Sequence, residues 1–276
     1  MKFLKFKKQF HFPDGTFSAQ LDFPVQLDVN LSIPTLAIHG FSFEELLVKT
    51  DCARQAGIEN LSLYVPYLPA RQDRVCNPGE PFTAKIAANL INSLGFKKVI
   101  TLEPHSDVIS GMIDRLKILT YKDVFDFSSI RELNRAGRIN LVAPDTGATK
   151  RTEKFAQSIL EKNPNADIRI IQGVKRRNLA TGEIVEIKIA DNIDLYGEDC
   201  LVVDDVCAMG GTFIGIHEAL KKNNAGRISL ILAHADAKNG LDELASIYES
   251  IYVTNSQKFE VTSPNIFVTD IFEETL

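Results

Sequence analysis

The chain has 276 residues, of which 45% are hydrophobic and 24% are charged, and its formal net charge is -5 at pH 7. This length provides enough apolar material for one large or two medium domains, while the acidic balance argues against a nucleic-acid-binding surface. The basic start, residues 1–10, lacks the apolar core of a signal peptide and no apolar run is long enough to cross a bilayer, so we expect a cytoplasmic protein with no membrane partner.

The predicted elements alternate between strands and helices along the chain. Loosely alternating apolar residues on both sides of the turn at residues 13–15 predict two strands first. Periodicity then predicts strands at 35–38, 61–67, 97–103, 139–144, 167–173, 201–203, 228–235 and 250–256, and helices at 43–56, 80–94, 150–162, from 212 onward and near 241. The four cysteines show neither metal-ligand nor redox-motif spacing, so they are expected to be free thiols.

This alternation predicts an α/β fold in which parallel sheets are flanked by helices. More than eight strands would crowd a single sheet, so two similar domains are expected. We place the boundary near Arg138, which gives an N-terminal domain of residues 1–138 and a C-terminal domain of residues 139–276.

The most informative stretch is LVVDDVCAMGGTF, residues 201–213. Three apolar residues predict a buried strand, Asp204 and Asp205 follow, and Gly210-Gly211 open onto a helical pattern. A glycine-bearing loop at the carboxyl end of a strand lets backbone N–H groups close around an anion, whereas ionised carboxylates accept hydrogen bonds from vicinal hydroxyls. The stretch therefore predicts a ribose-phosphate site, the alternative being an ordinary strand exit with solvated acids.

Two basic clusters follow predicted strands. Residues 66–74 end in Arg71, Gln72, Asp73 and Arg74, and two arginines can bind a polyphosphate. Residues 175–177 are three consecutive cations that precede a polar stretch and an alternating hairpin arm, so a mobile cationic loop is predicted that closes over a transferring phosphate. In each case the alternative is a solvated charged loop.

Two further residues follow strands, His105 and Asp145. A lone histidine is more often structural, and a lone aspartate before a helix is usually a cap. If the two side chains face one another across the domains, they can hold a metal ion that bridges nucleotide phosphates.

Taken in order, six motifs resemble the ribose-phosphate pyrophosphokinases, or PRPP synthetases, over about residues 64–255. The motifs are PYLPARQDR, GEPFTAK, ITLEPHS, PDTGATKR, KRR and LVVDDVCAMGGT. The resemblance implies two phosphoribosyltransferase-like (type I) domains, each a mostly parallel sheet flanked by helices. It also implies transfer of the β,γ-diphosphate of ATP to the anomeric hydroxyl of a 5-phosphorylated ribose in nucleotide biosynthesis, with release of AMP.

The resemblance assigns roles to single residues. ATP would be bound by Phe12, Asp14, Arg71, Gln72, Arg74 and His105, and Mg²⁺ would be held by His105 and Asp145. Asp204 and Asp205 would bind the ribose hydroxyls, and the 5-phosphate would be bound by the loop Ala208, Met209, Gly210, Gly211 and Thr212. Lys175 and Arg177 would stabilise the transition state. In the family the residues that match Phe12 and Asp14 reach the adenine bound by a neighbouring subunit. A homo-oligomer is therefore implied, a dimer at least and commonly a hexamer.

Departures from the family pattern leave the acceptor open. The family has Asp-Thr where this chain has Ala208-Met209, and Val75-Cys76 replace a charged pair. An open phosphate pocket would suit ADP-ribose, which short phage-encoded members of the family convert to ADP-ribose pyrophosphate in NAD⁺ rebuilding; such a protein would work in the host cytoplasm. Ribose 5-phosphate stays equally open as the acceptor. Further alternatives are a regulatory PRPP-synthetase-associated subunit, a PRPP-binding repressor and a PRPP-using phosphoribosyltransferase.

Overall fold

The computed structural model describes residues 1–22, 33–68, 72–134, 137–177, 184–190, 193–235, 241–261 and 263–273. Contacts divide the chain into two compact units, which we call unit 1 (Met1–Thr120 with Phe272–Leu276) and unit 2 (Tyr121–Ile271). The boundary expected near Arg138 lies later in the chain than this division. The segment after Thr120 belongs to unit 2, because the rings of Tyr121 and Phe127 pack against Phe155, with 5.3 Å between ring centroids in each pair. Among the described residues, no helix is long and apolar enough to span a membrane.

Unit 1 contains a parallel sheet whose described strands follow the order β3-β4-β5-β6. Its elements are β3 (Thr35–Ala37), α1 (Phe43–Gln55), β4 (Ser62–Tyr64), α2 (Thr83–Ser93), β5 (Lys98–Leu102), η1 (Asp107–Gly111) and β6 (Leu116–Leu119). Helices α1 and α2 bury Leu46 and Ile91 in one hydrophobic cluster with the strand residue Leu63. Ser42 begins α1 as an N-cap, because its hydroxyl accepts a hydrogen bond from the Glu45 N–H at 3.2 Å.

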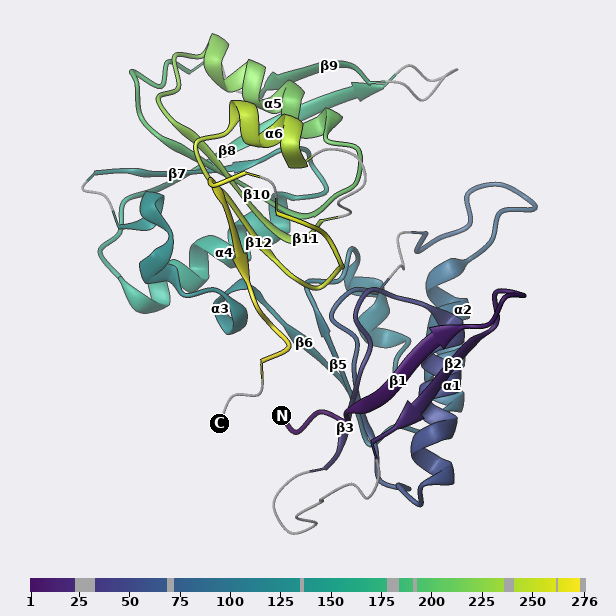
Figure 1. Ribbon diagram of the computed structural model, residues 1–276. Coiled ribbons are helices and arrows are strands. Elements are labelled where there is room, and N and C mark those ends of the chain that lie inside the picture. The colour runs from purple at the N-terminus through teal and green to yellow at the C-terminus, as the bar shows by residue number, and fades with distance from the viewer. Residues whose placement is uncertain are drawn as a thin grey trace. The chain divides into compact units, whose positions relative to one another are not determined.

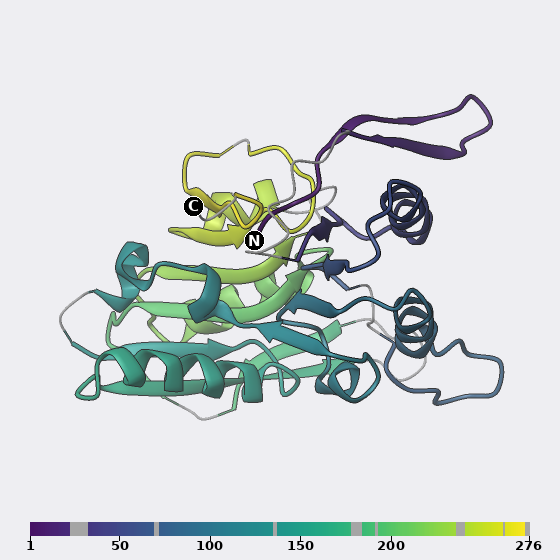
Figure 2. The ribbon, with the colours of Figure 1, turned by 90° about the horizontal axis from the view of Figure 1, so that it is seen from below.

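An antiparallel ribbon precedes this sheet, as the sequence predicts. Strands β1 (Phe6–His11) and β2 (Phe17–Leu21) pair around a tight turn, in which the Phe12 N–H donates to the Thr16 carbonyl at 2.8 Å. The ribbon packs along α1 and appears as the purple hairpin beside the dark blue helix in Figure 1 and Figure 2. All of β1 except its first residue is exposed, so the ribbon presents one open strand.

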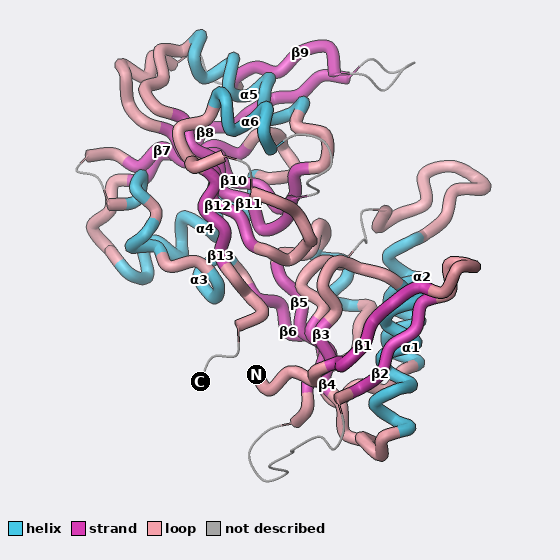
Figure 3. Tube along the Cα trace, in the orientation of Figure 1, coloured by secondary structure: helices cyan, strands magenta, loops and turns pink. Residues whose placement is uncertain are grey.

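Unit 2 contains a larger sheet, in the order β13-β12-β11-β10-β7-β8-β9, in which only the β8–β9 pair of described strands is antiparallel. Its strands are β7 (Ile139–Ala143), β8 (Ile168–Arg177), β9 (Ile184–Ile189), β10 (Cys200–Cys207), β11 (Ile228–Ala235), β12 (Ile251–Thr254) and β13 (Ile266–Thr269). Its helices are α3 (Tyr121–Val124), η2 (Phe127–Ser129), η3 (Arg131–Leu133), α4 (Thr149–Lys162), α5 (Gly211–Lys222) and α6 (Leu241–Ile247). In Figure 3, α5 and α6 lie together on one side of the magenta strands, and α4 lies on the other.

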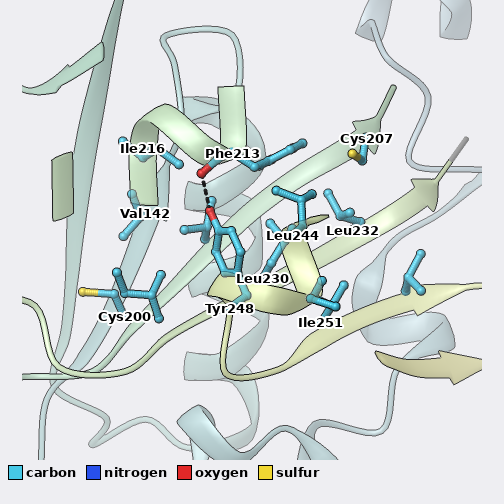
Figure 4. Close-up of a cluster of buried hydrophobic side chains, with 14 of the residues drawn as sticks. Val142, Cys200, Cys207, Phe213, Ile216, Leu230, Leu232, Leu244, Tyr248 and Ile251 are labelled. Atoms are coloured by element: carbon cyan, nitrogen blue, oxygen red, sulfur yellow. Dashed lines mark hydrogen bonds between the residues drawn. The ribbon is translucent and has the colours of Figure 1, made fainter. Parts of the chain in front are cut away.

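The core of unit 2 is built between its sheet and helices α5 and α6. Strand residues such as Val202 and Leu230 are fully buried there, together with Phe213 of α5 and Leu244 of α6. Figure 4 shows the phenol of Tyr248 in this cluster, where its hydroxyl donates to the Phe213 carbonyl at 2.7 Å. Since Phe213 lies in the first turn of α5, this buried hydrogen bond fixes the start of that helix.

Candidate functional site

The sequence suggested that the paired acids follow the end of their strand. In the structure they lie inside it, because β10 runs from Cys200 to Cys207. The strand continues to Cys207 because the backbone keeps its pairing with β11, where Val206 lies opposite His234. Asp205 is buried, with 2% of its surface exposed. Two hydrogen bonds order the pair: the Asp205 N–H donates to Oδ1 of Asp204 at 2.9 Å, and the Tyr121 hydroxyl donates to the Asp204 carbonyl at 2.5 Å.

A single guanidinium contacts both carboxylates. The Nη1 atom of Arg151 lies 3.2 Å from Oδ1 of Asp204 and 3.3 Å from Oδ1 of Asp205, and only 11% of the arginine side chain is exposed. Burial and the neighbouring charge of Asp205 raise the pKa of Asp204 well above its usual value, and Arg151 opposes this shift. The acids are therefore held near one another by a cation that faces little water.

The loop between β10 and α5 has the backbone geometry of an anion site. Gly210 is the residue before the helix and adopts φ +76°, a left-handed conformation that favours glycine. The helix begins at Gly211, so its first N–H groups and the Thr212 side chain lie at the end of the loop. Met209 precedes them with 71% of its surface exposed, next to Ala208.

Lys175 reaches this loop from strand β8. Its Nζ donates to the Thr212 Oγ1 at 2.5 Å. The sequence predicted that the cations at 175–177 form a loop. In the structure they belong to β8, which ends at Arg177. The Arg177 side chain and residues 178–183, where the mobile loop was predicted, lie outside the described residues. The predicted hairpin arm is confirmed, since β8 and β9 pair with Lys175 opposite Ile187.

Gly173 lets β8 approach the loop that follows β7. A Cβ atom at this position would lie 2.5 Å from the Pro144 carbonyl oxygen and 2.9 Å from Cδ1 of Ile216. No side chain fits at these distances, so the close passage of β8 that leads to Lys175 depends on glycine here.

Asp145 lies in the loop between β7 and α4. Its Oδ1 accepts hydrogen bonds from the N–H groups of Gly147 at 2.9 Å and Ala148 at 3.3 Å, which orients the carboxylate at the start of α4. A carboxylate is a ligand that Mg²⁺ prefers, so the chemistry of this residue fits the implied metal. Within the described ranges, no group of three or more His, Cys, Asp or Glu side chains is arranged to hold a metal ion.

Unit 1 carries the residues expected to contact ATP. Arg71 lies outside the described residues, whereas the Gln72 carbonyl accepts from the Ala84 N–H at 3.2 Å and so joins this loop to α2. Arg74 is exposed and its Nε lies 2.8 Å from Oδ1 of Asp73. A hydrogen bond from Ser106 and this contact lower the pKa of Asp73. Asp73 thus links the arginine-bearing loop to the loop that holds His105, which is exposed.

The other expected ATP contacts lie at the tip of the ribbon. Phe12 is 48% exposed and its ring centroid lies 4.9 Å from that of Phe10. Asp14 is ordered locally, because its Oδ1 accepts from the Thr16 N–H at 2.9 Å, and this hydrogen bond lowers the pKa of Asp14. The contacts of these two side chains with Phe10 and Thr16 lie within the ribbon itself.

Sequence reasoning missed three residues that support the site. Arg151 and Tyr121 contact Asp204, and Asp73 forms a hydrogen bond with Ser106 of the neighbouring loop, so each acts through a tertiary contact. A weak signal existed for two of them. Arg151 is in the basic helix start after Asp145, and Asp73 lies in a cluster of arginines; no pattern marks Tyr121.

The comparisons with known proteins agree on one family. The family model described as "Phosphoribosyl transferase domain" matches residues 119–264. The chain is 31% identical over 272 residues to the ribose-phosphate pyrophosphokinase of Campylobacter jejuni, covering 96% of this chain and 84% of that protein. It is 30% identical over 264 residues to the enzyme of the same name from Helicobacter hepaticus, covering 94% and 82%.

A solved structure shares the fold. The crystal structure of phosphoribosylpyrophosphate synthetase from Mycobacterium smegmatis matches with a TM-score of 0.75, covering 97% of this chain and 86% of that one. The two sequences are 18% identical, so this likeness concerns the fold.

Proposed function

Because the chain belongs to the ribose-phosphate pyrophosphokinase family, we propose that it transfers the β,γ-diphosphoryl group of ATP to the anomeric hydroxyl of a ribose that carries a 5-phosphate. In this reaction the anomeric oxygen forms a bond to the β-phosphorus of ATP. The bond between that phosphorus and the oxygen bridging to the α-phosphate breaks, AMP leaves with this oxygen, and the hydroxyl proton is released to solvent.

The observation that carries the proposal is the arrangement of unit 2 around the end of β10. The buried Asp205 with its partly buried neighbour Asp204, a glycine loop at the start of α5 and the ammonium of Lys175 at Thr212 belong to one compact unit. Asp204 and Asp205 accept hydrogen bonds from the vicinal hydroxyls of the ribose. The N–H groups after Gly210 bind its 5-phosphate, because a helix N-terminus stabilises an anion.

Catalysis depends on charge placed near the transferring phosphates. Lys175 and Arg177 lie at the end of β8 and lower the barrier by stabilising negative charge on the diphosphoryl oxygens as the bond to the β-phosphorus breaks. Asp145 and His105 are the residues that would hold Mg²⁺, and that ion would supply charge neutralisation on the ATP phosphates. Gln72, Arg71 and Arg74 would bind ATP, with Asp73 fixing their loop.

The acceptor is ribose 5-phosphate or ADP-ribose, and one feature favours the larger molecule. In the phosphate loop, Ala208 and Met209 supply neither the carboxylate nor the hydroxyl that the family pattern has there, and Met209 is mostly exposed. A terminal phosphate loses a hydroxyl donor from this change, whereas a phosphate that continues into a second phosphate needs an open side.

The protein is further proposed to act as a homo-oligomer. At the tip of the ribbon, 48% of the Phe12 surface is exposed, and Asp14 lies close by in the same turn. An adenine from a neighbouring subunit would bury the Phe12 ring. Light scattering coupled to gel filtration would contradict this proposal if the active protein ran as a monomer.

The function is tested by incubating the protein with ATP, Mg²⁺ and either acceptor, and by measuring AMP and the phosphorylated sugar by mass spectrometry. The control is Asp205→Asn, which removes one acid of the pair and is expected to lower turnover with any acceptor. Release of AMP with ribose 5-phosphate alone would contradict ADP-ribose as the acceptor. Release of AMP with ADP-ribose alone would contradict ribose 5-phosphate as the acceptor. AMP with neither would overturn the proposed activity and favour a regulatory subunit.

A further inference from the structure

We propose that Arg151 is a positioning residue for the acceptor sugar: it holds the carboxylates of Asp204 and Asp205 in the orientation that binds the two vicinal hydroxyls, without touching the substrate. This inference rests on the function proposed above and adds a residue to it.

The geometry begins with the fixed start of α4. The carboxylate of Asp145 accepts the N–H groups of Gly147 and Ala148, and the buried Thr152 donates its hydroxyl to the Ala148 carbonyl at 3.0 Å. Arg151 is therefore carried on a well-anchored first turn, and its side chain extends to β10. Its Nη1 meets Oδ1 of both acids at nearly equal distances, 3.2 Å and 3.3 Å.

Charge explains why the pair needs this arginine. Asp204 and Asp205 are adjacent on a buried strand, and both Asp205 and Asp145 raise the pKa of Asp204. Among the described charges that act on Asp204, Arg151 is the one that favours its ionised form. In the hydrogen bond between Tyr121 and Asp204 described above, the acceptor is the backbone carbonyl of Asp204.

Removal of the guanidinium would change how the pair behaves. Two neighbouring buried carboxylates without a cation tend to share a proton, since a like charge disfavours ionisation. A shared proton would turn the acids toward each other and away from a ligand. The affinity for a vicinal diol would then fall, while ATP binding, which uses other residues, would be little affected.

The test compares Arg151→Gln with Arg151→Lys, and uses Lys154→Gln as the control because Lys154 is an exposed cation on the same helix. Each variant is assayed with the sugar phosphate that the wild type accepts and with its 2-deoxy counterpart, which lacks one hydroxyl of the diol. Sugar binding without turnover is measured by calorimetry, and folding by circular dichroism.

For Arg151→Gln we expect the KM for the sugar to rise on the order of tenfold or more, while the KM for ATP stays within about threefold of the wild type. The preference for the ribose over the 2-deoxy sugar should shrink, because that preference depends on the oriented acids. Arg151→Lys should retain part of both properties, since it keeps the charge but contacts the pair at a single point.

Several results would overturn the inference. An unchanged sugar KM, or an unchanged preference for the 2-hydroxyl, in folded Arg151→Gln would show that the arginine does not act through the acids. Equal losses in the KM values for sugar and ATP would indicate a general structural role. If Arg151→Gln does not fold, wild-type sugar affinity and 2-hydroxyl preference in Arg151→Lys would contradict the inference. A wild type that neither binds nor converts any sugar phosphate would overturn the proposed function as well.

Discussion

The ammonium of Lys175 donates a hydrogen bond to the hydroxyl of Thr212, with 2.5 Å between Nζ and Oγ1. The two residues come from the end of β8 and the first turn of α5, and the bond joins the cationic arm to the loop proposed to bind the 5-phosphate. A phosphate that enters this loop would therefore meet a cation already in place and compete for its hydrogen bond.

Lys175→Ala should lower kcat by on the order of a hundredfold or more, because it removes a charge that stabilises the transition state. The matched control is Lys188→Ala, an exposed lysine on the same hairpin that lies opposite Val174. Steady-state AMP release measures both variants. A rate for Lys175→Ala equal to that of the control would remove the residue from the mechanism.

The double change Ala208→Asp with Met209→Thr should move acceptor preference toward ribose 5-phosphate. It restores the family's carboxylate and hydroxyl to the phosphate loop, and the added hydroxyl can donate a hydrogen bond to a terminal phosphate, which favours the smaller acceptor. We expect the ratio of kcat/KM for ribose 5-phosphate over ADP-ribose to rise on the order of tenfold. Met209→Leu keeps an apolar side chain and should leave the ratio unchanged; a similar rise in that control would assign the effect to loop packing.

Gly173→Ala should destabilise unit 2 and reduce activity together. The new methyl group would lie 2.5 Å from the Pro144 carbonyl oxygen, so β8 must move away from the β7 loop. Overpacking of this kind costs about 1–3 kcal/mol, which calorimetry would detect as a lower Tm. Gly111→Ala is the control, since a methyl group there meets no atom within 4 Å and the residue has no positive φ. Equal Tm values for the two variants would refute the steric explanation.

The thiols should differ in reactivity according to burial. Burial raises the pKa of the Cys200 thiol to about 12, whereas Cys76 is exposed. Iodoacetamide at about pH 8 should therefore alkylate Cys76 in the native protein and Cys200 only after denaturation, as peptide mass spectrometry would show. Fast native labelling of Cys200 would contradict its buried position.

The same shift predicts an alkaline loss of stability. Between the ordinary thiol pKa near 9 and the folded value near 12, the unfolded chain loses a proton that the folded protein keeps, so stability falls as pH rises. Denaturant titrations at about pH 8 and about pH 10 should show a smaller decline for Cys200→Ala than for Cys76→Ala. Identical declines would show that Cys200 does not contribute.

Periodicity predicted the elements that have one clearly buried face or a continuous apolar run. Strands β7 and β11 are buried at every position, and their apolar runs are visible in the sequence. Strand β13 was missed because its middle residues, Phe267 and Val268, are exposed at the edge of the sheet. Strand β6 has the same difficulty, since its side chains are only partly buried.

The motifs did not predict the geometry of the candidate site in full. The acids at 204 and 205 suggested the end of a strand, yet backbone pairing with β11 does not depend on side-chain charge and carries β10 past them. Arg151 has no distinguishing sequence signal beyond a basic helix start, because its contact with the acids forms only when α4 packs beside β10. Contacts of that kind depend on tertiary structure, which local patterns do not report.

The chain passes between the two units twice, once at residues 120 and 121 and again at 271 and 272. The returning residue, Phe272, lies in unit 1 with its ring centroid 4.5 Å from that of His39 and 5.6 Å from that of Tyr64. A fragment that stops at Thr120 would lose the Phe272 contact of both rings, although Tyr64 would keep its stacking on Phe3 at 5.5 Å. Because unit 1 is built from two separate segments of the chain, a gene fusion or domain swap in this family has to carry residues 272–276 along with residues 1–120.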